Sequence, residues 1–337
     1  MKPLIKLSAN ENCYGCSPLA LRAGRLQFDN ICEYPDVAPA ELKQRLAEHY
    51  GVQKSNIVTG AGSVRIIEGL IQSLVVKDEE VLTFDNTFSI YGQLTHAMHK
   101  SCRFAPLTEM VCKPENLYPY INERTRLVFI SNPNNPTGTI ITHSELDSFL
   151  QTIPGNITVV TDEAYAEYAT DPSFPDSFAL QKKYPNLVIL RTFSKIYGLA
   201  ALRVGYAIMN EELVHRLEQN QIPFSINFIA ASAATAALGD TGFVGLSASA
   251  NAIQRDLLHS RLSCMGYKVV PSQANFIYLA FDRTDEKNEV RDMLLSNGIL
   301  VCDLEKSGQR ALRISIGRPE GNKKLIEVLG QVAVSVC

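Results

Sequence analysis

Apolar residues form short unbroken runs along the first two thirds of the chain, and segments with helical spacing separate these runs. Such runs are typical of strands that are covered on both faces, and we expect strands of this kind at 126–131, 157–161, 187–190 and 204–209. Further strands are expected at 56–60 and 80–85, with helices at 39–50, 62–74 and 88–98. This alternation predicts an α/β fold with a mostly parallel sheet flanked by helices.

The pattern changes after Asn220. An Ala-rich helix is expected at 228–238 and a long helix at 243–265, followed by short strands and helices that predict a compact α+β unit. Earlier, Thr142 and Glu145 form a capping box, which predicts the start of a helix. We therefore expect an N-terminal arm at 1–37, a large domain at 38–243 and a small C-terminal domain at 244–337.

Length and charge limit the classes of function. A chain of 337 residues is long enough for two domains, and a net charge of −3 argues against nucleic acid or an anionic membrane as the main partner. The first residues lack the apolar core of a signal peptide, and no run has the roughly 18–20 apolar residues of a membrane span. Cys13 and Cys16 have no second pair to complete a zinc site, so we predict reduced cysteines, no metal and a cytoplasmic location.

Polar groups that suit an anionic ligand follow the strand at 187–190. Thr192, Ser194, Lys195 and Arg203 lie close together in the sequence. A lysine amine forms a Schiff base with a carbonyl, and the other groups are donors for a phosphate. A loop with one exposed lysine would explain the same residues, so this segment alone does not decide the function.

Other strand ends carry complementary groups. The segment 59–63 opens a helix whose N-terminus suits a phosphate, 132–138 presents three asparagines, and Asp162 lies near Tyr165. Each has a purely structural explanation, as a turn or a helix cap. Ligands of a doubly wound sheet bind at the carboxyl ends of its strands, however, and together these groups match pyridoxal phosphate. A lysine serves the aldehyde, an acid the ring nitrogen, an Asn and a Tyr the phenolic oxygen, and Tyr91 the ring face.

With these motifs, the chain resembles the histidinol-phosphate aminotransferase family. That family belongs to the fold-type I, aspartate-aminotransferase-like enzymes that use pyridoxal phosphate. The resemblance covers nearly the whole length. It rests on the segments 7–12 with Tyr14, 34–36, 132–138, 162–165, 191–206 and 312–317.

The resemblance implies a role for each matching residue. Lys195, Asp162 and Tyr165 would be catalytic, and substrate would contact Tyr14 and Arg313. Arg65 departs from the family pattern, and it is expected either to offer the substrate a replacement cation or to be a solvated helix residue. Asn135 and Tyr165 would bind the phenolic oxygen. The phosphate would be held by Ser63, Val64, Thr192, Ser194 and Arg203, and by Tyr34 of a second subunit. The family also implies a homodimer with shared active sites, acting on an amino donor and a 2-oxo acid.

Two departures from the family pattern concern the substrate. Val64 and Arg65 stand where the family has an acidic pair, and Cys302 replaces an arginine expected to bind the phosphate of histidinol phosphate. The neighbouring Asp303 is expected to oppose an anion. Histidinol phosphate remains the donor that the family implies, despite these departures. The open alternatives are another amino acid, aromatic ones included, decarboxylation of threonine phosphate, and a non-enzymatic relative that keeps the fold.

Overall fold

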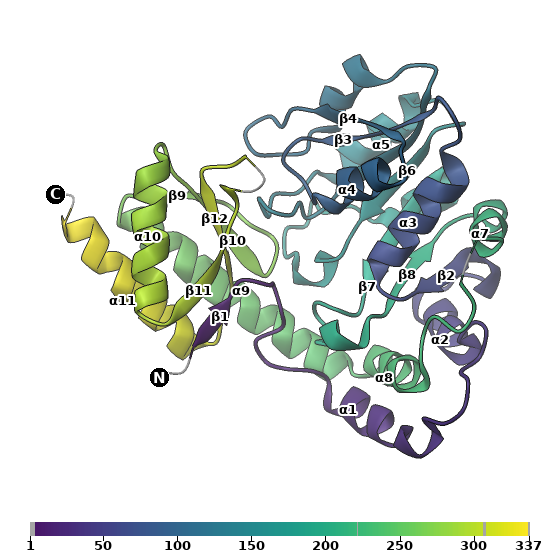
Figure 1. Ribbon diagram of the computed structural model, residues 1–337, viewed down its shortest axis with the longest axis horizontal. Coiled ribbons are helices and arrows are strands. Elements are labelled where there is room, and N and C mark those ends of the chain that lie inside the picture. Colours follow the sequence, from purple (N-terminus) through teal and green to yellow (C-terminus); the bar gives the residue numbers. More distant parts are fainter. Residues whose placement is uncertain (1–3, 221, 306–307, 336–337) are drawn as a thin grey trace.

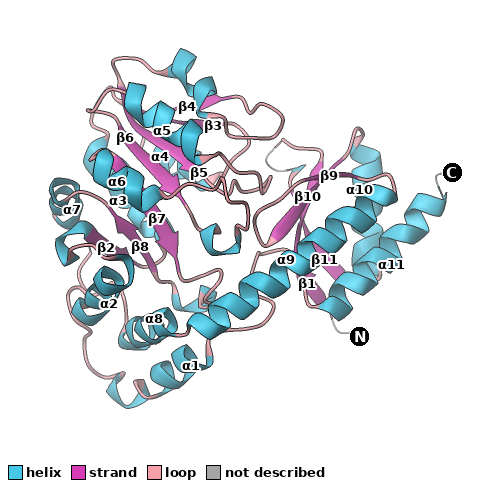
Figure 2. Ribbon diagram, turned by 180° about the vertical axis from the view of Figure 1, so that it is seen from behind, coloured by secondary structure: helices cyan, strands magenta, loops and turns pink. Residues whose placement is uncertain are grey.

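A seven-stranded sheet forms the centre of the larger part of the molecule (Figures 1 and 2). The computed structural model describes residues 4–335 except 221 and 306–307. The strand order is β2-β8-β7-β6-β5-β3-β4, and only β8 runs antiparallel to its neighbours. The prediction of a mostly parallel sheet is confirmed. The strands are β2 (Ile57–Gly60), β3 (Glu80–Phe84), β4 (Ser101–Ala105), β5 (Thr125–Ser131), β6 (Thr158–Asp162), β7 (Leu187–Thr192) and β8 (Gly205–Ile208).

Helices cover both faces of this sheet, which explains why its central strands are apolar throughout. One face packs against α3 (Ser63–Leu74), α4 (Ile90–Ala97) and α7 (Glu211–Glu218). The other packs against α2 (Ala40–Tyr50), α5 (His143–Thr152), α6 (Ser177–Lys183) and α8 (Phe228–Gly239). The predicted capping box opens α5: the Glu145 N–H donates to Thr142 Oγ1 over 3.2 Å, and the Thr142 N–H donates to Glu145 Oε2 over 2.7 Å.

A second, five-stranded sheet has the order β1-β11-β12-β10-β9. Its strands are β1 (Ile5–Leu7), β9 (Lys268–Val270), β10 (Phe276–Ala280), β11 (Ile299–Asp303) and β12 (Ala311–Ser315). The helices α9 (Thr241–Cys264), α10 (Thr284–Ser296) and α11 (Pro319–Ser335) lie with it (Figure 1). Leu7 and Ile299 share one core with α9, α10 and α11, so the first strand of the chain belongs to the C-terminal sheet.

The N-terminal segment contacts both parts of the molecule. Besides β1, it forms α1 (Pro18–Arg25), which packs against α8 (Figure 1). The sequence pattern did not predict β4, a strand at the sheet edge whose residues are mostly exposed or half-buried. Short 3-10 helices complete the described structure: η1 (Phe28–Asn30), η2 (Lys54–Asn56), η3 (Pro114–Tyr120), η4 (Ala166–Tyr168) and η5 (Ala200–Leu202).

Among the described residues, no single helix has the length and apolar composition to cross a membrane. The pair α8 and α9 meets those two criteria jointly, but the two helices are bent by 76° relative to each other.

Candidate active site

A cavity of about 280 Å³ opens at the carboxyl ends of β5, β6 and β7 and is also lined by residues of β12 and of the segment after β1. It brings together ten of the residues that the sequence predicted for a site. These are Ser63, Val64, Asn135, Asp162, Tyr165, Thr192, Ser194, Lys195, Arg203 and Arg313. The prediction that strand ends carry the chemistry therefore agrees with the geometry.

Lys195 lies in the turn that follows β7. Its Nζ donates to the Ala9 carbonyl oxygen over 3.3 Å and lies 5.3 Å from the centre of the Tyr165 ring. No carboxylate forms an ion pair with this amine among the described residues. The amine is thus held loosely inside the cavity, as a nucleophile that must form a covalent bond requires.

Asp162 ends β6 and is buried. The Tyr91 hydroxyl donates to its Oδ2 over 2.8 Å, and the Ala164 N–H donates to Oδ1 over 3.2 Å. Burial raises the pKa of this carboxyl to about 6, although both hydrogen bonds act against the rise. Because both hydrogen-bond partners are neutral, a protonated ring nitrogen in the cavity would supply the missing positive charge.

An anion cradle forms where α3 begins. Arg203 has φ +55°, and its Nη1 donates to Ser194 Oγ over 3.2 Å and to the Ala200 carbonyl over 2.9 Å. Gly62, at φ +80°, directly precedes the helix, and a Cβ there would collide with the Arg203 guanidinium. The helix N-terminus, a guanidinium and a hydroxyl therefore face one small volume, which suits a phosphate.

Arg313 of β12 also lines the cavity. Its Nη1 donates to Asn135 Oδ1 over 2.6 Å and its Nη2 to the Ser8 carbonyl over 3.0 Å. Its buried Nε has no hydrogen-bond partner among the described residues. The guanidinium thus has one unpaired N–H group, and it lies next to the asparagine expected to hold the phenolic oxygen of the cofactor.

The prediction for Tyr91 is wrong. Its side chain is fully buried, and its ring stacks on Phe129 with centroids 4.6 Å apart, so it cannot cover a ligand in the cavity. The reason is the helix start: α4 begins at Ile90, which turns Tyr91 toward the sheet and leaves Phe88 in the preceding loop. Phe88 lines the cavity instead, and Tyr91 serves as the hydrogen-bond donor beneath Asp162.

Three further residues do not reach this cavity in the single chain. Arg65 forms an ion pair with Glu68 one turn along α3, which corrects its prediction as a substrate contact. Tyr14 lies 5.8 Å below the Arg318 guanidinium. Tyr34 is 84% exposed and contacts Phe224, so it contributes nothing to the cavity of its own chain.

Six residues that line the cavity were not predicted as site residues: Ala9, Asn10, Phe88, Ser131, Ala164 and Ala200. Asn10 is buried at φ +55°, and its Nδ2 donates to the Tyr165 hydroxyl over 3.1 Å. Ser131 is the last residue of β5, so the strand-end rule would have found it. Ala9 and Asn10 follow β1, whose pairing with β11 is not visible in the local pattern.

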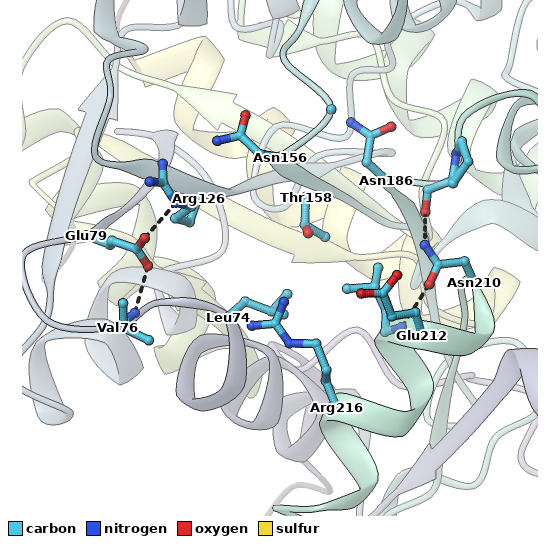
Figure 3. A pocket seen from close by; sticks show the side chains of 13 residues that line it. Leu74, Val76, Glu79, Arg126, Asn156, Thr158, Asn186, Asn210, Glu212 and Arg216 are labelled. Atoms are coloured by element: carbon cyan, nitrogen blue, oxygen red, sulfur yellow. Dashed lines mark hydrogen bonds and ion pairs between the residues drawn. The ribbon is translucent and has the colours of Figure 1, made fainter.

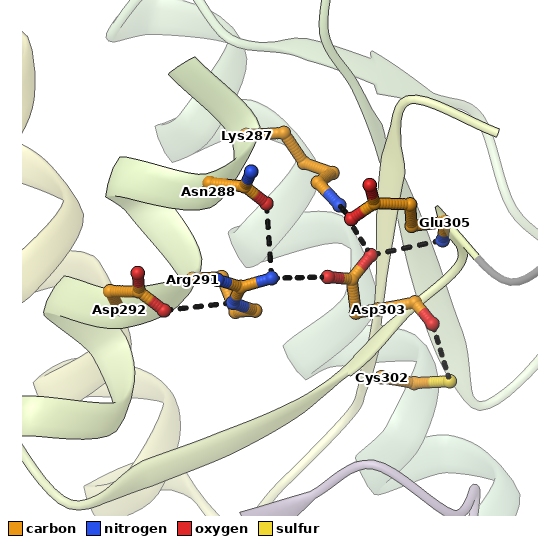
Figure 4. Close-up of polar contacts among 7 residues, drawn as sticks. All are labelled: Lys287, Asn288, Arg291, Asp292, Cys302, Asp303 and Glu305. Atoms are coloured by element: carbon orange, nitrogen blue, oxygen red, sulfur yellow. Dashed lines mark hydrogen bonds and ion pairs between the residues drawn. The ribbon is translucent and has the colours of Figure 1, made fainter. Parts of the chain in front are cut away.

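The expected effect of Asp303 on an anion is also wrong. Its carboxylate accepts from Lys287 Nζ over 2.7 Å and from Arg291 Nη1 over 2.8 Å (Figure 4). Because neighbouring residues of a strand point to opposite faces, Cys302 lies on the other face, opposite Arg313 in the register of β11 and β12. Cys302 packs there beside Tyr278 and Ala311.

A larger hollow of about 530 Å³ lies at the opposite ends of the strands (Figure 3). Its lining contains no lysine, and two of its charged groups form an ion pair: Arg126 Nε lies 2.6 Å from Glu79 Oε1. Asn210 Nδ2 likewise donates to the Pro185 carbonyl over 2.6 Å. This hollow offers no reactive group, and the cavity around Lys195 is the candidate active site.

A lysine amine, a buried acid and an anion cradle that share one cavity suit pyridoxal phosphate, so fold and site together define the class of pyridoxal-phosphate enzymes with this two-sheet architecture. The family model "Aminotransferase class I and II" matches residues 2–329, and the chain belongs to that family. The protein is a pyridoxal-phosphate-dependent aminotransferase, which acts on an amino donor and a 2-oxo acid.

Relatives cover almost the whole chain. The histidinol-phosphate aminotransferase of Anaeromyxobacter sp. (strain Fw109-5) is 39% identical over 329 residues, 97% of this chain and 90% of the relative. That of Geobacillus sp. (strain WCH70) is 38% identical over 330 residues, 98% and 90% of the two chains. The crystal structure of histidinol-phosphate aminotransferase from Sinorhizobium meliloti in complex with pyridoxal-5'-phosphate superposes with a TM-score of 0.92 at 26% identity, covering 100% of this chain and 92% of the other.

Proposed function

We propose that this aminotransferase moves the amino group of histidinol phosphate to 2-oxoglutarate. The observation that carries the proposal is the full-length similarity, at 35–39% identity, to relatives that are all named histidinol-phosphate aminotransferases. The cavity supports it by presenting Arg313 beside Asn135, in the same cavity as the groups proposed to hold the cofactor.

The bound cofactor supplies an aldehyde that accepts the amino group and a ring that withdraws electrons from the substrate carbon. Lys195 Nζ would hold the cofactor through its aldehyde and, when free, would move the proton at that carbon. Asp162 keeps the ring nitrogen protonated, and Asn135 and Tyr165 bind the phenolic oxygen. The anion cradle with Arg203 orients the phosphate, helped by Thr192, Ser194 and the backbone of Ser63 and Val64.

Arg313 is proposed to grip a carboxylate of the 2-oxo acid. Arg313→Met should raise the KM for 2-oxoglutarate by about 10–100-fold, because a charge-assisted hydrogen bond contributes roughly 1.5–3 kcal/mol. The KM of Arg313→Lys should lie between those of the wild type and Arg313→Met, because lysine keeps the positive charge but not the planar guanidinium. Steady-state kinetics with 2-oxoglutarate measures both. An unchanged KM in Arg313→Met would show that another group binds the carboxylate.

A second candidate is an aminotransferase for non-phosphorylated amino acids, aromatic ones included. The side chains next to Arg313 on its sheet face favour it: Tyr278 and Cys302 occupy the opposite positions in the register, and neither carries a positive charge. A phosphate in this direction would meet a phenol and a thiol in place of a second cation. Tyr14, on the arm, remains a proposed substrate contact under either candidate.

A half-reaction screen separates the candidates. Each amine is mixed with the yellow holoenzyme, and conversion of the cofactor to its amine form is followed by absorbance. Histidinol phosphate should react at least tenfold faster than phenylalanine, tyrosine or threonine phosphate. Faster reaction with the aromatic amino acids would establish the second candidate. Release of carbon dioxide from threonine phosphate would instead identify a decarboxylase.

We further propose a homodimer in which Tyr34 reaches the anion cradle of the partner subunit. Large apolar side chains are exposed along the N-terminal segment, Ile31 by 71%, and they continue onto the segment that holds Phe224. The set comprises Leu26, Phe28, Ile31, Tyr34, Val37, Ile222 and Phe224. An apolar surface of this extent is typical of an interface. A cytoplasmic location is proposed as well, because every described cysteine is a free thiol.

Ile31→Asp should convert the dimer to a monomer, because each subunit would then bury an unpaired carboxylate in the proposed interface. Light scattering after size-exclusion chromatography measures the mass. Leu295→Asp, at an exposed apolar position on α10, is the control and should remain dimeric. Tyr34→Phe should keep the dimer and weaken cofactor binding by about 2–12-fold, the value of one hydrogen bond. A wild-type monomer would refute the proposal.

A further inference from the structure

We propose that Arg191 and Glu163 form a positioning pair behind the active site, which fixes Asp162 and sets the electrostatic potential at the cofactor ring. The inference rests on the proposed role of Asp162. Neither residue lines the cavity. Both are direct neighbours in sequence of residues that do: Glu163 follows Asp162, and Arg191 precedes Thr192.

The pair lies on the far face of the sheet. Side chains alternate along a strand, so Asp162 and Thr192 face the cavity while Glu163 and Arg191 point to the core shared with α2 and α6. Arg191 Nη2 and Nε donate to Glu163 Oε2 over 2.6 and 3.1 Å. The Glu163 N–H also donates to the Leu190 carbonyl over 2.8 Å. Side chain and backbone together tie the carboxyl ends of β6 and β7 to each other.

Aromatic rings hold the Arg191 guanidinium in place. It lies 5.6 Å from the centre of the Tyr50 ring and 5.2 Å from that of Phe178, and these two rings stack on each other. The Tyr50 hydroxyl lies 2.5 Å from that of Tyr206, the cross-strand neighbour of Arg191 on β8. The Arg191 side chain is 13% exposed, and its guanidinium contacts both rings and the Glu163 carboxylate. These contacts restrain the guanidinium and, with it, the two strand ends that it joins.

The charges of the pair are close enough to act on the cavity. The Glu163 side chain is fully buried, its Oε1 has no hydrogen-bond partner among the described residues, and its charge adds to the rise in the pKa of Asp162 that burial begins. Arg191 offsets that charge, and Glu167 Oε1 approaches Arg191 Nη1 at 3.4 Å. The other titratable groups packed around the pair are His49, Tyr50, Tyr197 and Tyr206.

The two members of the pair therefore have opposite electrostatic effects on the cofactor, and this distinguishes positioning by charge from simple support of the fold. Without the Glu163 charge, the cavity becomes more positive, which disfavours a proton on the Lys195 nitrogen bound to the cofactor. Without the Arg191 charge, the cavity becomes more negative, which favours that proton.

The test is a pH titration of the cofactor absorbance in reconstituted holoenzyme, without substrate. Glu163→Gln should lower the pH midpoint of the absorbance change, and Arg191→Met should raise it, each by on the order of 0.5 pH unit. The double variant should return close to the wild-type midpoint. Cofactor affinity, from fluorescence titration of the apoprotein, should fall at least fivefold in both single variants, because each breaks the side-chain contact that ties the end of β6, and with it Asp162, to the end of β7.

Glu79→Gln is the matched control, since it breaks the Glu79–Arg126 pair at the other end of the sheet (Figure 3) and should leave the midpoint unchanged. If both single variants shift the midpoint in the same direction, or neither does while their melting temperatures fall, the pair only supports the fold. If Arg191→Met does not fold, the Glu163→Gln shift and its reversal in the double variant decide. The substrate plays no part, so a wrong donor leaves this result untouched.

Discussion

Lys195→Ala should lack the yellow absorbance of the lysine-bound cofactor and should lose transaminase activity by about 10⁴-fold or more. Two contributions vanish together, the covalent bond to the cofactor and the group that moves the proton at the substrate carbon. The second alone contributes roughly 10²–10⁴-fold. Because Lys195 Nζ makes a single, long hydrogen bond among the described residues, to the Ala9 carbonyl, the melting temperature should change little.

The measurement combines an absorbance spectrum, a single-turnover assay and a thermal melt. Lys182→Ala, an exposed position on α6, is the control and should match the wild type in all three. Arg203 and Ser194 remain in the Lys195 variant, so noncovalent cofactor binding should persist at a reduced level. A yellow Lys195→Ala protein with an unchanged spectrum would mean that a different amine carries the cofactor.

Asp162→Asn should lower the catalytic rate by about 10²–10³-fold and at the same time stabilise the apoprotein at pH 8. The loss of rate follows because a neutral amide no longer favours a protonated ring nitrogen, a preorganised charge of the kind worth that factor. The gain in stability follows because the carboxylate is buried beside neutral donors. Asparagine keeps the shape, and the Tyr91 hydroxyl can still donate to its carbonyl oxygen.

The pH dependence gives the sign. The pKa of Asp162 rises from 3.8 to about 6 on folding. The folded apoprotein therefore binds this proton more tightly than the unfolded chain does. The resulting stabilisation of the folded state is complete below pH 4 and is lost as the pH rises through 6. A difference of about 2 pH units corresponds to at most roughly 3 kcal/mol. Asp162→Asn should thus exceed the wild-type apoprotein in stability at pH 8 and match it near pH 4.

Denaturant unfolding of the apoprotein at the two pH values measures the effect. Asp147→Asn is the control, because the hydrogen bond from Lys183 lowers the pKa of Asp147 and the substitution should bring no gain at pH 8. Equal stability of Asp162→Asn and wild type at pH 8 would show that the carboxylate is already compensated in the apoprotein.

Much of the fold was predictable because its signals are local. Unbroken apolar runs located β5, β6 and β7, and the Thr142 capping box located the start of α5. What escaped were elements whose stability comes from distant partners. β1 has three residues and depends on β11, almost 300 positions later, and β4 is an exposed edge strand without a clear apolar pattern.

The site followed the same division. Asp162, Lys195 and Arg203 lie at or just after strand ends, where the chain itself places them together. Tyr91, and not Phe88, was predicted to cover the cofactor ring because the start of α4 was placed too early in the chain. Helix ends are the least certain part of a sequence pattern. Asp303 is neutralised by Lys287 and Arg291 of α10. The local sequence pattern does not show which carboxylate these two residues bind.

The pairing of β1 with β11 constrains how the enzyme is made. The Ser8 carbonyl binds Arg313, and the Asn10 carboxamide binds Ser315, across 305 positions in each case. A chain emerging from the ribosome can form most of the large sheet early, but Ala9 and Asn10 find their places only after β12 has been synthesised. A nascent chain that ends before β12 therefore has Lys195 but lacks Arg313 and the contact that holds Ser8, so we expect cofactor capture only after β12 has been synthesised.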